Sequence, residues 1–314
     1  MKLLFDNCLS QNPSGSERFS EPLGIGLGNF DGLHIGHMVL INTLIDECKF
    51  NGIKSMLYTF RQHPDDIVRK NLLTSIITDT QKKVEILGES HLDYLFLDEF
   101  DENFSHMEPD AFIKEILVGR FGVRLAVAGF DYSFGYKGRG GVEMLKNYGK
   151  MLGFKVIIIP SVRLGHEVVS STLIRQYVKA GNMQKVCRML GRHFSISGPV
   201  VKGAGNGKKM GIPTANIKPS SEMLIPAEGV YITRTEVGGL IYPSITNVGK
   251  NPTFNFMDIS IETYIFDFSK DIYNSMIEIF FEKRIRGEVK FDSAQLLMER
   301  INKDIASARR YFSK

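Results

Sequence analysis

The sequence has 314 residues, a formal net charge of +4 and an ordinary globular composition, with 43% hydrophobic and 24% charged residues. This length exceeds one small domain and fits two, each able to bury its own core. The mild, scattered positive charge suits anionic small molecules better than a dedicated nucleic-acid surface. No apolar run approaches the roughly 18 residues of a membrane span, residues 1–20 lack a signal-peptide core, and the three cysteines show no paired spacing. We therefore expect a soluble, cytoplasmic protein.

Strand-like and helix-like runs alternate in the first half of the chain, which indicates an α/β fold with a parallel, doubly wound sheet. In such sheets ligands bind beyond the carboxyl ends of the strands, where the strand order reverses. The loops after the first, second and fourth strands are therefore expected to converge on one crevice. The expected strands span residues 23–28, 53–60, 92–97, 123–129 and 154–160.

Two histidines open an apolar helix directly after the first strand. Residues 28–37 read Gly-Asn-Phe-Asp-Gly-Leu-His-Ile-Gly-His, so His34 and His37 share one helix face. Metal ligation, a structural role in capping a turn, and hydrogen bonding to a nucleotide phosphate in the transition state are the three interpretations. Metal ligation is disfavoured because zinc needs three or four ligands and the three cysteines are far apart with no paired spacing. The free N–H groups of the helix start and the glycine-rich turn favour the phosphate.

This stretch resembles the His-x-Gly-His signature of the nucleotidylyltransferase superfamily. Its fuller form, Asn-Phe-Asp-Gly-x-His-x-Gly-His, resembles the prokaryotic bifunctional riboflavin kinase/FAD synthetase family, and the resemblance covers nearly the whole chain. It implies a Rossmann-like FMN adenylyltransferase domain in which His34 and His37 stabilise charge while AMP is transferred from ATP. The implied nucleotide contacts come from Gly28, Asn29, Phe30, Asp31 and Gly36.

A further helix start follows the fifth strand, where residues 169–175 read Val-Ser-Ser-Thr-Leu-Ile-Arg. Either serine could cap this helix and leave the arginine in its opening turns, with a guanidinium suited to phosphate oxygens. On its own the pattern describes a capped helix with a surface arginine. It also resembles the family's Ser-Ser-Thr-x-Ile-Arg motif, which implies that Ser170, Ser171, Thr172 and the catalytic Arg175 grip the ATP phosphates.

Aromatic residues follow the fourth strand, and residues 129–135 resemble the family's Gly-x-Asp-Phe-x-Phe-Gly element. The resemblance implies that Asp131 lies near the nucleotide. Phe130, Tyr132 and Phe134 supply the flat apolar partners that an isoalloxazine ring needs. An aromatic turn packed into the core explains Phe134 equally well.

The loop after the second strand matches the family only in part. His63 and Pro64 are kept, which implies flavin contact, but Arg61-Gln62 stands where the family usually has Glu-Pro. The substitution adds a positive charge near the expected crevice.

Short β-rich runs separated by Gly, Pro and Asn turns make up the second half, which describes a small antiparallel barrel. A closing helix with apolar residues at helical spacing follows Asp292-Ser293, which would cap it and let it pack on the barrel. We place the domain boundary near residue 186, giving domains 1–186 and 187–314. The expected strands cover residues 193–201, 229–235, 240–248, 259–268 and 275–281.

Residues 211–216 read Gly-Ile-Pro-Thr-Ala-Asn and on composition describe a loop that enters a strand. They also resemble the riboflavin kinase signature Gly-x-Pro-Thr-Ala-Asn, which implies that Thr214 and Asn216 supply oxygen ligands to a Mg²⁺ ion on the ATP phosphates. Lys208 stands where the family commonly has arginine, so the charge is kept but the guanidinium fork is lost. Nucleotide contacts are implied for Gly207, Lys208 and Gly211.

A neutral hydroxyl nucleophile benefits from a general base, and Glu262 is the candidate. On composition alone this residue faces solvent from a strand, whereas the family's Glu-x-x-x-x-Asp strand implies that it accepts the proton of the riboflavin 5′-hydroxyl. Further matches to the family imply flavin contacts from Asn247, Gly249 and Arg286.

The sequence therefore predicts an enzyme that phosphorylates riboflavin to FMN in the barrel and adenylylates FMN to FAD and pyrophosphate in the α/β domain. Both steps are expected to need Mg²⁺ and ATP, with small molecules as partners, no nucleic acid, no membrane and the homo-oligomeric state left open. Three alternatives stay open. Only one module is active, FAD synthetase alone being the first choice; the acceptor is another phosphorylated molecule; or the basic barrel binds nucleic acid.

Overall fold

The computed structural model describes residues 1–5, 19, 21–62, 75–203, 211–250 and 259–313. The chain forms two compact units, Met1–Ser170 and Ser171–Lys314. The predicted boundary at residue 186 falls inside helix α8 (Met183–Leu190) and stays a prediction.

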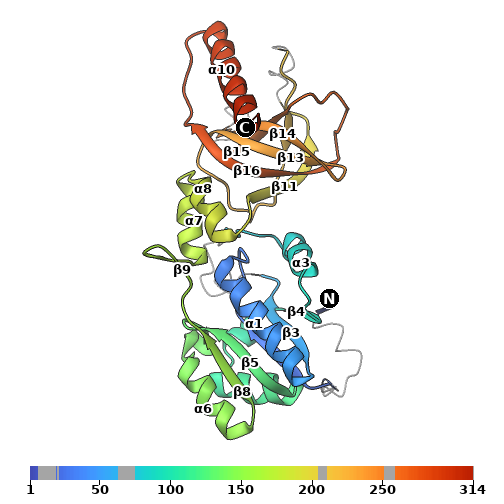
Figure 1. Cartoon of the computed structure of the whole chain (residues 1–314), viewed down its shortest axis with the longest axis vertical. Helices are drawn as coiled ribbons and strands as arrows, with labels where there is room; N and C mark the ends of the chain where they lie inside the picture. The colour runs from blue at the N-terminus through green and yellow to red at the C-terminus, as the bar shows by residue number, and fades with distance from the viewer. Residues whose placement is uncertain (6–18, 20, 63–74, 204–210, 251–258, 314) are drawn as a thin grey trace. The chain divides into compact units, whose positions relative to one another are not determined.

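The first unit is built on a six-stranded sheet in which every neighbouring pair is parallel. The doubly wound sheet predicted from the sequence is therefore confirmed. One strand was missed, because residues 2–5 form only a four-residue run at a polar terminus. In spatial order the strands are β1 (Lys2–Phe5), β4 (Tyr94–Asp98), β3 (Lys54–Phe60), β2 (Leu23–Leu27), β5 (Val123–Gly129) and β8 (Lys155–Ile159) (Figure 1).

The strand order reverses between β2 and β5. From β2 the chain adds β3 and β4 on one side and then β5 and β8 on the other. In a doubly wound sheet this reversal is where a ligand crevice opens at the carboxyl ends. The loops that follow β2 and β5 therefore carry the expected motifs to the reversal point.

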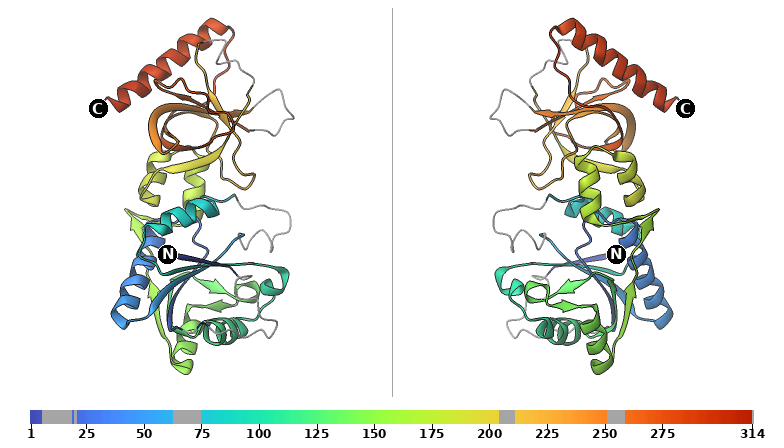
Figure 2. Two further views of the ribbon diagram at one scale, coloured as in Figure 1. Left: turned by 90° about the vertical axis from the view of Figure 1, so that its right-hand side faces the viewer. Right: turned by 90° about the vertical axis from the view of Figure 1, so that its left-hand side faces the viewer.

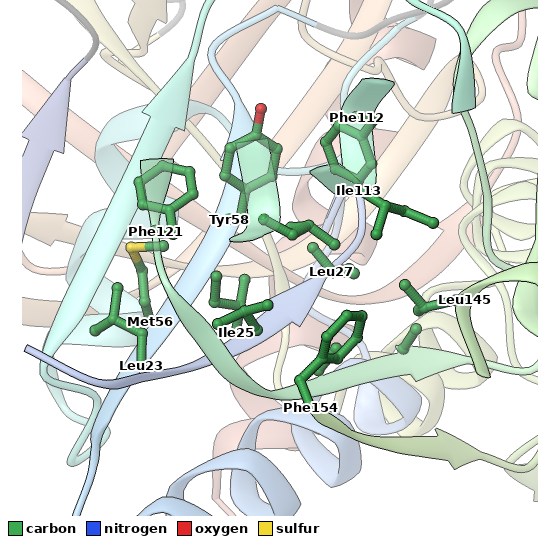
Figure 3. Packing of buried hydrophobic residues seen from close by; sticks show 14 of the residues in the cluster. Leu23, Ile25, Leu27, Met56, Tyr58, Phe112, Ile113, Phe121, Leu145 and Phe154 are labelled. Atoms are coloured by element: carbon green, nitrogen blue, oxygen red, sulfur yellow. The ribbon is translucent and has the colours of Figure 1, made fainter. Parts of the chain in front are cut away.

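Strand β2 separates the two core layers of the unit. Leu23, Ile25 and Leu27 point to one face and pack among Tyr58, Phe121 and neighbouring residues (Figure 3). Gly24 faces helix α1 (Ile35–Asn51), where an added Cβ would lie 2.2 Å from the Cys48 Sγ. The alternation of leucine or isoleucine with glycine thus lets α1 pack directly on the strand.

Further short elements surround the sheet. They are α3 (Thr80–Gly88), α4 (Glu102–Ser105), α5 (Pro109–Ala111), η2 (Phe112–Arg120), η3 (Tyr136–Gly138) and α6 (Val142–Leu152), with the strand pairs β6 (Ser133–Phe134) and β7 (Gly140–Gly141), and β9 (Arg163–Leu164) and β10 (Glu167–Val168).

The second unit is a closed antiparallel barrel, as the sequence predicted. Its closing helix α10 (Ala294–Phe312) is capped by Ser293, whose side chain accepts from the Leu296 N–H at 3.2 Å. This helix packs outside the barrel through Ile305, Ala308 and Phe312 (Figure 2). Around the barrel the strands are β11 (Phe194–Val201), β12 (Ala215–Ile217), β15 (Ile259–Ile265), β14 (Leu240–Lys250), β13 (Gly229–Val237) and β16 (Met276–Arg286).

Hydroxyl groups fill part of the barrel interior. The Thr233 hydroxyl lies 2.8 Å from both the Ser244 and the Thr246 hydroxyls, and Thr246 donates to Thr263 at 3.0 Å. Thr235 adds contacts to Ser244 and Thr263, and all five side chains are fully buried. Because each hydroxyl has partners inside the network, the buried polar groups are satisfied.

Two helices precede the barrel within the same unit. Helix α7 (Ser171–Lys179) packs on α8, and α8 packs on β11 and β16. The apolar face of α8 is buried through Met183, Val186, Met189 and Leu190. A cut after residue 186 would remove α7 and split α8.

We expect a fragment that begins at residue 171 to be more stable than one that begins at residue 187. The shorter fragment loses buried apolar contacts, and each lost kcal/mol lowers the Tm of a domain approaching 150 residues by about 2–4 °C. Thermal unfolding of the two fragments, followed by circular dichroism, measures the difference. Equal Tm values would place the boundary at residue 186 instead.

Candidate active sites

The Gly28–His37 segment makes a tight turn between β2 and α1. Phe30, Gly32 and Leu33 have positive φ angles of 49°, 86° and 39°. Left-handed backbone is unusual for phenylalanine and leucine, so contacts outside the turn must hold it. The carboxylate of Asp31, only 5% exposed, accepts hydrogen bonds from the backbone N–H groups of Ile77 and Thr78. Asp31 therefore joins this turn to the segment that leads into α3.

The two histidines lie against each other at the start of α1. The His34 Nδ1 accepts the His37 backbone N–H at 3.2 Å and caps the helix. Because this nitrogen accepts, a neutral His34 carries its proton on Nε2. The rings are stacked with centroids 3.6 Å apart, and an added Cβ on Gly36 would approach the His34 ring to 3.2 Å. The capping role thus belongs to His34 alone, and glycine at position 36 makes room for its ring.

Among the described residues, no third metal ligand accompanies these histidines. Within the ranges that the structure describes, no group of three or more His, Cys, Asp or Glu side chains is arranged to hold a metal ion. The histidine pair is instead surrounded by a helix N-terminus and a buried aromatic ring, since Phe30 contacts His37 edge-on at 5.2 Å.

The aromatic residues after β5 divide between surface and core. Phe130 is 48% exposed, whereas Phe134 is buried and packs on Phe112 at 5.4 Å. Tyr132 stacks on Phe134 and is partly buried against the same core. Asp131 is exposed. Phe130 is therefore the aromatic side chain of this group that a ligand reaches most easily.

Several predicted site residues belong to neither the histidine turn nor the aromatic segment. Ser170 ends the first unit, while Ser171, Thr172 and Arg175 open α7 at the beginning of the second. Their grouping with the histidines stays a prediction. The residues that lie outside the described ranges are His63, Pro64, Gly207 and Lys208.

Strand register brings the kinase candidates together. On the outer face of the barrel, Glu262 of β15 is the direct cross-strand partner of Asn216 on β12 and of Asn247 on β14. Thr214 donates to one Glu262 carboxylate oxygen at 3.3 Å, and Ser260 donates to the other at 3.0 Å. The carboxylate is thus held in a row of polar side chains, between the buried Ile261 and Thr263 of its own strand.

A cavity of about 340 Å³ opens beside this row. Glu262, Thr214 and Asn247 line one wall, and α10 supplies Leu297 and Ile301 on another. An apolar cavity with a few convergent polar groups is the usual form of a small-molecule site. A side chain at position 249 would meet the Glu288 carboxylate at 2.0 Å, so Gly249 keeps the rim of this region close-packed.

Arg286 enters the same cavity and is fixed by an ion pair. Its Nε donates to the Asp304 Oδ2 at 2.8 Å, and the two side chains are only 13% and 4% exposed. Arg300 of α10 approaches the other Asp304 oxygen at 3.3 Å. Asp304 therefore ties helix α10 to the arginine at the cavity.

A second cavity, of about 290 Å³, also borders Thr214. It is lined by Pro213 and by the loop from Phe268 to Tyr273. Thr214 lines both cavities, so this residue borders the two volumes. This arrangement suits transfer of a group from a donor in one cavity to an acceptor in the other.

Sequence reasoning missed Ser260 and Asp304 in the barrel and Lys83 in the first unit. Ser260 stands two residues before Glu262, on the same strand face, and strand alternation could have found it. Asp304 and Lys83 sit in amphipathic helices, where a charged residue is usually solvent-facing. No local signal marks their burial.

The first unit carries a candidate phosphate-binding motif at a helix N-terminus beside a doubly wound sheet. The second unit is a barrel with a row of polar side chains around a carboxylate. Together these features indicate a two-domain, nucleotide-dependent transferase. Residues 16–173 match the FAD synthetase family model and residues 190–312 match the riboflavin kinase model. The chain therefore belongs to the bifunctional riboflavin kinase/FMN adenylyltransferase family, and it is an enzyme that carries both domains. The predicted boundary at residue 186 lies between the two matched ranges.

Curated relatives match along most of their length. Proteins named bifunctional riboflavin kinase/FMN adenylyltransferase from Buchnera aphidicola of Schizaphis graminum and from Bacillus subtilis are 33% and 32% identical, covering 92% of this chain and 94% and 92% of theirs. The Escherichia coli K12 protein of that name is 30% identical, with 91% of each chain covered. A crystal structure from Streptococcus pneumoniae, described as a macrolide-efflux protein, superposes with a TM-score of 0.87 at 29% identity, covering 98% and 99%. In the described part of this chain, every helix is too short or too polar to cross a membrane.

We expect Asp304→Asn to weaken riboflavin binding and to destabilise the barrel unit. Removing one partner of a buried ion pair costs about 3–5 kcal/mol, because Arg286 is left buried and uncompensated. The KM for riboflavin should rise about tenfold, because Arg286 loses the charged hydrogen bond to Asp304 that fixes it at the cavity. Urea unfolding and steady-state kinetics measure the two effects.

Asp267→Asn is the matched control. Asp267 also pairs with an arginine, Arg309, at 2.7 Å, but its side chain is 77% exposed. This variant should leave both the unfolding midpoint and the riboflavin KM nearly unchanged. Equal effects of the two substitutions would mean that burial of Asp304 has no special role.

Proposed function

We propose that this chain phosphorylates riboflavin to FMN at the Glu262 cavity and then transfers AMP from ATP to FMN at the turn that holds His34 and His37. The observation that carries the proposal is the row formed by Asn216, Glu262 and Asn247 across three strands, with Thr214 bordering two cavities. A flavin needs a large apolar volume, and a phosphoryl donor needs polar groups at its edge.

For the kinase step, Glu262 is the general base. Its carboxylate is held by Thr214 and Ser260, so it can accept the proton of a hydroxyl that enters the 340 Å³ cavity. The flavin would occupy the cavity beneath α10, with Arg286 and Asn247 at its edge and Gly249 beside the lining residue Glu288. ATP would approach from the cavity beyond Thr214, whose lining includes Pro213.

The oxygen donors of Thr214 and Asn216 fit a Mg²⁺ ion, which prefers hard oxygen ligands. When bound, the ion would neutralise charge on the ATP phosphates. The hydroxyl of Ser260 lies 3.4 Å from the Asn216 Oδ1, so the amide is already oriented toward the Glu262 row. Gly207, Lys208 and Gly211 would complete the phosphate contacts.

For the adenylyl step, the acceptor phosphate of FMN is already ionised, so no base is needed. His34 and His37 would donate to the α-phosphate as charge develops there, next to the N–H groups of the α1 start. Gly28, Asn29, Phe30 and Gly36 would shape the nucleotide site, and Asp31 would hold the turn. The remaining nucleotide contacts would come from Asp131, Ser170, Ser171, Thr172 and Arg175, and the flavin contacts from His63, Pro64, Phe130, Tyr132 and Phe134.

We place the enzyme in the cytoplasm, with riboflavin, FMN and ATP as its small-molecule partners. The scattered positive charge and the absence of a long apolar run in the sequence support this placement. The polar row of the barrel lies beside a cavity, which favours a small-molecule partner over a nucleic acid.

We expect single substitutions to separate the two activities. His37→Ala should lower FAD formation about 100-fold or more, because one charge-stabilising donor is lost, and should leave FMN formation intact. Glu262→Ala should do the reverse. Purified variants are assayed with riboflavin or FMN as substrate. A fall of both activities in either variant would contradict the assignment of two sites.

We expect riboflavin, ATP and Mg²⁺ to give FMN first and FAD later. Chromatographic separation of the flavins over time measures the sequence. Chelating the metal should stop both steps, because the phosphates of ATP would lose their counter-charge. If FMN accumulates and FAD never forms, only the kinase module is active; if riboflavin is unchanged while added FMN yields FAD, only the synthetase module is.

A further inference from the structure

Lys83 of α3 is a buried charged side chain that lies outside every motif. It is 7% exposed, and its ammonium group donates to the Asn29 carbonyl at 3.3 Å. Burial lowers the pKa of this lysine, while the nearby Asp31 carboxylate favours its charged form. A buried ammonium is retained only where its contacts compensate for lost water.

The Asn29 carbonyl that Lys83 contacts immediately precedes the residues of the turn that have positive φ angles. Phe30, the next residue, has φ 49° and a fully buried ring, and Leu33 repeats this geometry at φ 39°. Such conformations persist where surrounding contacts fix them, and they cluster at functional sites. His34 follows this turn directly and caps α1.

Three side chains hold the first half of the turn from two directions. The Thr59 hydroxyl of β3 donates to the same Asn29 carbonyl at 2.9 Å. The Asp31 carboxylate binds the backbone of Ile77 at 2.9 Å and of Thr78 at 3.2 Å, just before α3. Lys83 thus links α3 to the turn, while Asp31 links the turn to the segment just before that helix.

We propose that Lys83 is a positioning residue for adenylyl transfer. It fixes the turn at Asn29 and Phe30, and through this turn it fixes the orientation of His34 and His37. Lys83 itself touches no substrate. The inference rests on the proposed function of the histidine turn. It predicts that loss of the ammonium misplaces the histidines in the transition state more than it weakens substrate binding.

Lys83→Met tests the proposal in the full-length protein, because methionine keeps the length and removes the charge. The kcat for FAD formation should fall at least tenfold while the KM values for FMN and ATP stay within about threefold. The kinase activity of the same molecule should be unchanged. Lys146→Met, which removes a lysine paired with Glu143 on α6 whose side chain is 43% exposed, is the matched control and should leave both activities as they are.

If Lys83 only stabilises the fold, the kinetic result is different. Replacing it with an apolar residue would leave kcat within twofold, whatever the Tm, and this result would overturn the proposal. Lys83→Arg, which keeps the charge, should recover part of the lost kcat. If Lys83→Met does not fold, Thr59→Val decides, because it removes the other donor to the Asn29 carbonyl: a lower kcat supports the proposal and an unchanged one overturns it.

The His37→Ala variant distinguishes failure of this inference from failure of the proposed function. If His37→Ala keeps full FAD formation, the proposed site itself is wrong. If His37→Ala loses FAD formation and Lys83→Met does not, only the role of Lys83 fails.

Discussion

The register of three barrel strands is the constraint on which the proposed kinase site depends. Side chains alternate between the two faces of a strand, so a slip of one residue would turn Glu262 inward and Thr263 outward. The buried hydroxyls of Thr233, Thr246 and Thr263 oppose such a slip, because each would lose partners that water could not replace. The interior network therefore fixes the outer row of Asn216, Glu262 and Asn247, and closure of the barrel leaves no edge at which pairing could shift.

In the first unit, the candidate catalytic residues are positioned in a different way. Its histidines depend on a turn rather than on strand register, and the turn contains left-handed residues that need external contacts. Glycines in β2 bring α1 close to the sheet, while Asp31, Thr59 and Lys83 hold the turn from neighbouring elements. In both units, the groups proposed to do chemistry are placed by buried polar contacts a few ångströms behind them.

Much of the fold could be predicted from the sequence, because periodicity is a local signal. The five predicted strands of the sheet and the capped closing helix are present. The motif residues of the kinase site could be named from short strings, and the register of the barrel brings them together. Strand β1 was missed because four residues carry too little periodicity, and the hydroxyl core was missed because Thr233 and Thr235 look like solvent-facing residues. Lys83 and Asp304 could not be predicted, since their partners lie 54 and 18 residues away.

We propose that strand register places a base, metal ligands and a flavin cavity at one point of the barrel. A crystal structure with ADP, Mg²⁺ and FMN tests it most directly. We expect a metal ion at about 2.0–2.1 Å from the Thr214 and Asn216 oxygens, the flavin ring beneath α10, and Glu262 within hydrogen-bonding reach of the terminal ribityl oxygen. A flavin bound away from this cavity, or a metal held by other residues, would contradict this proposal.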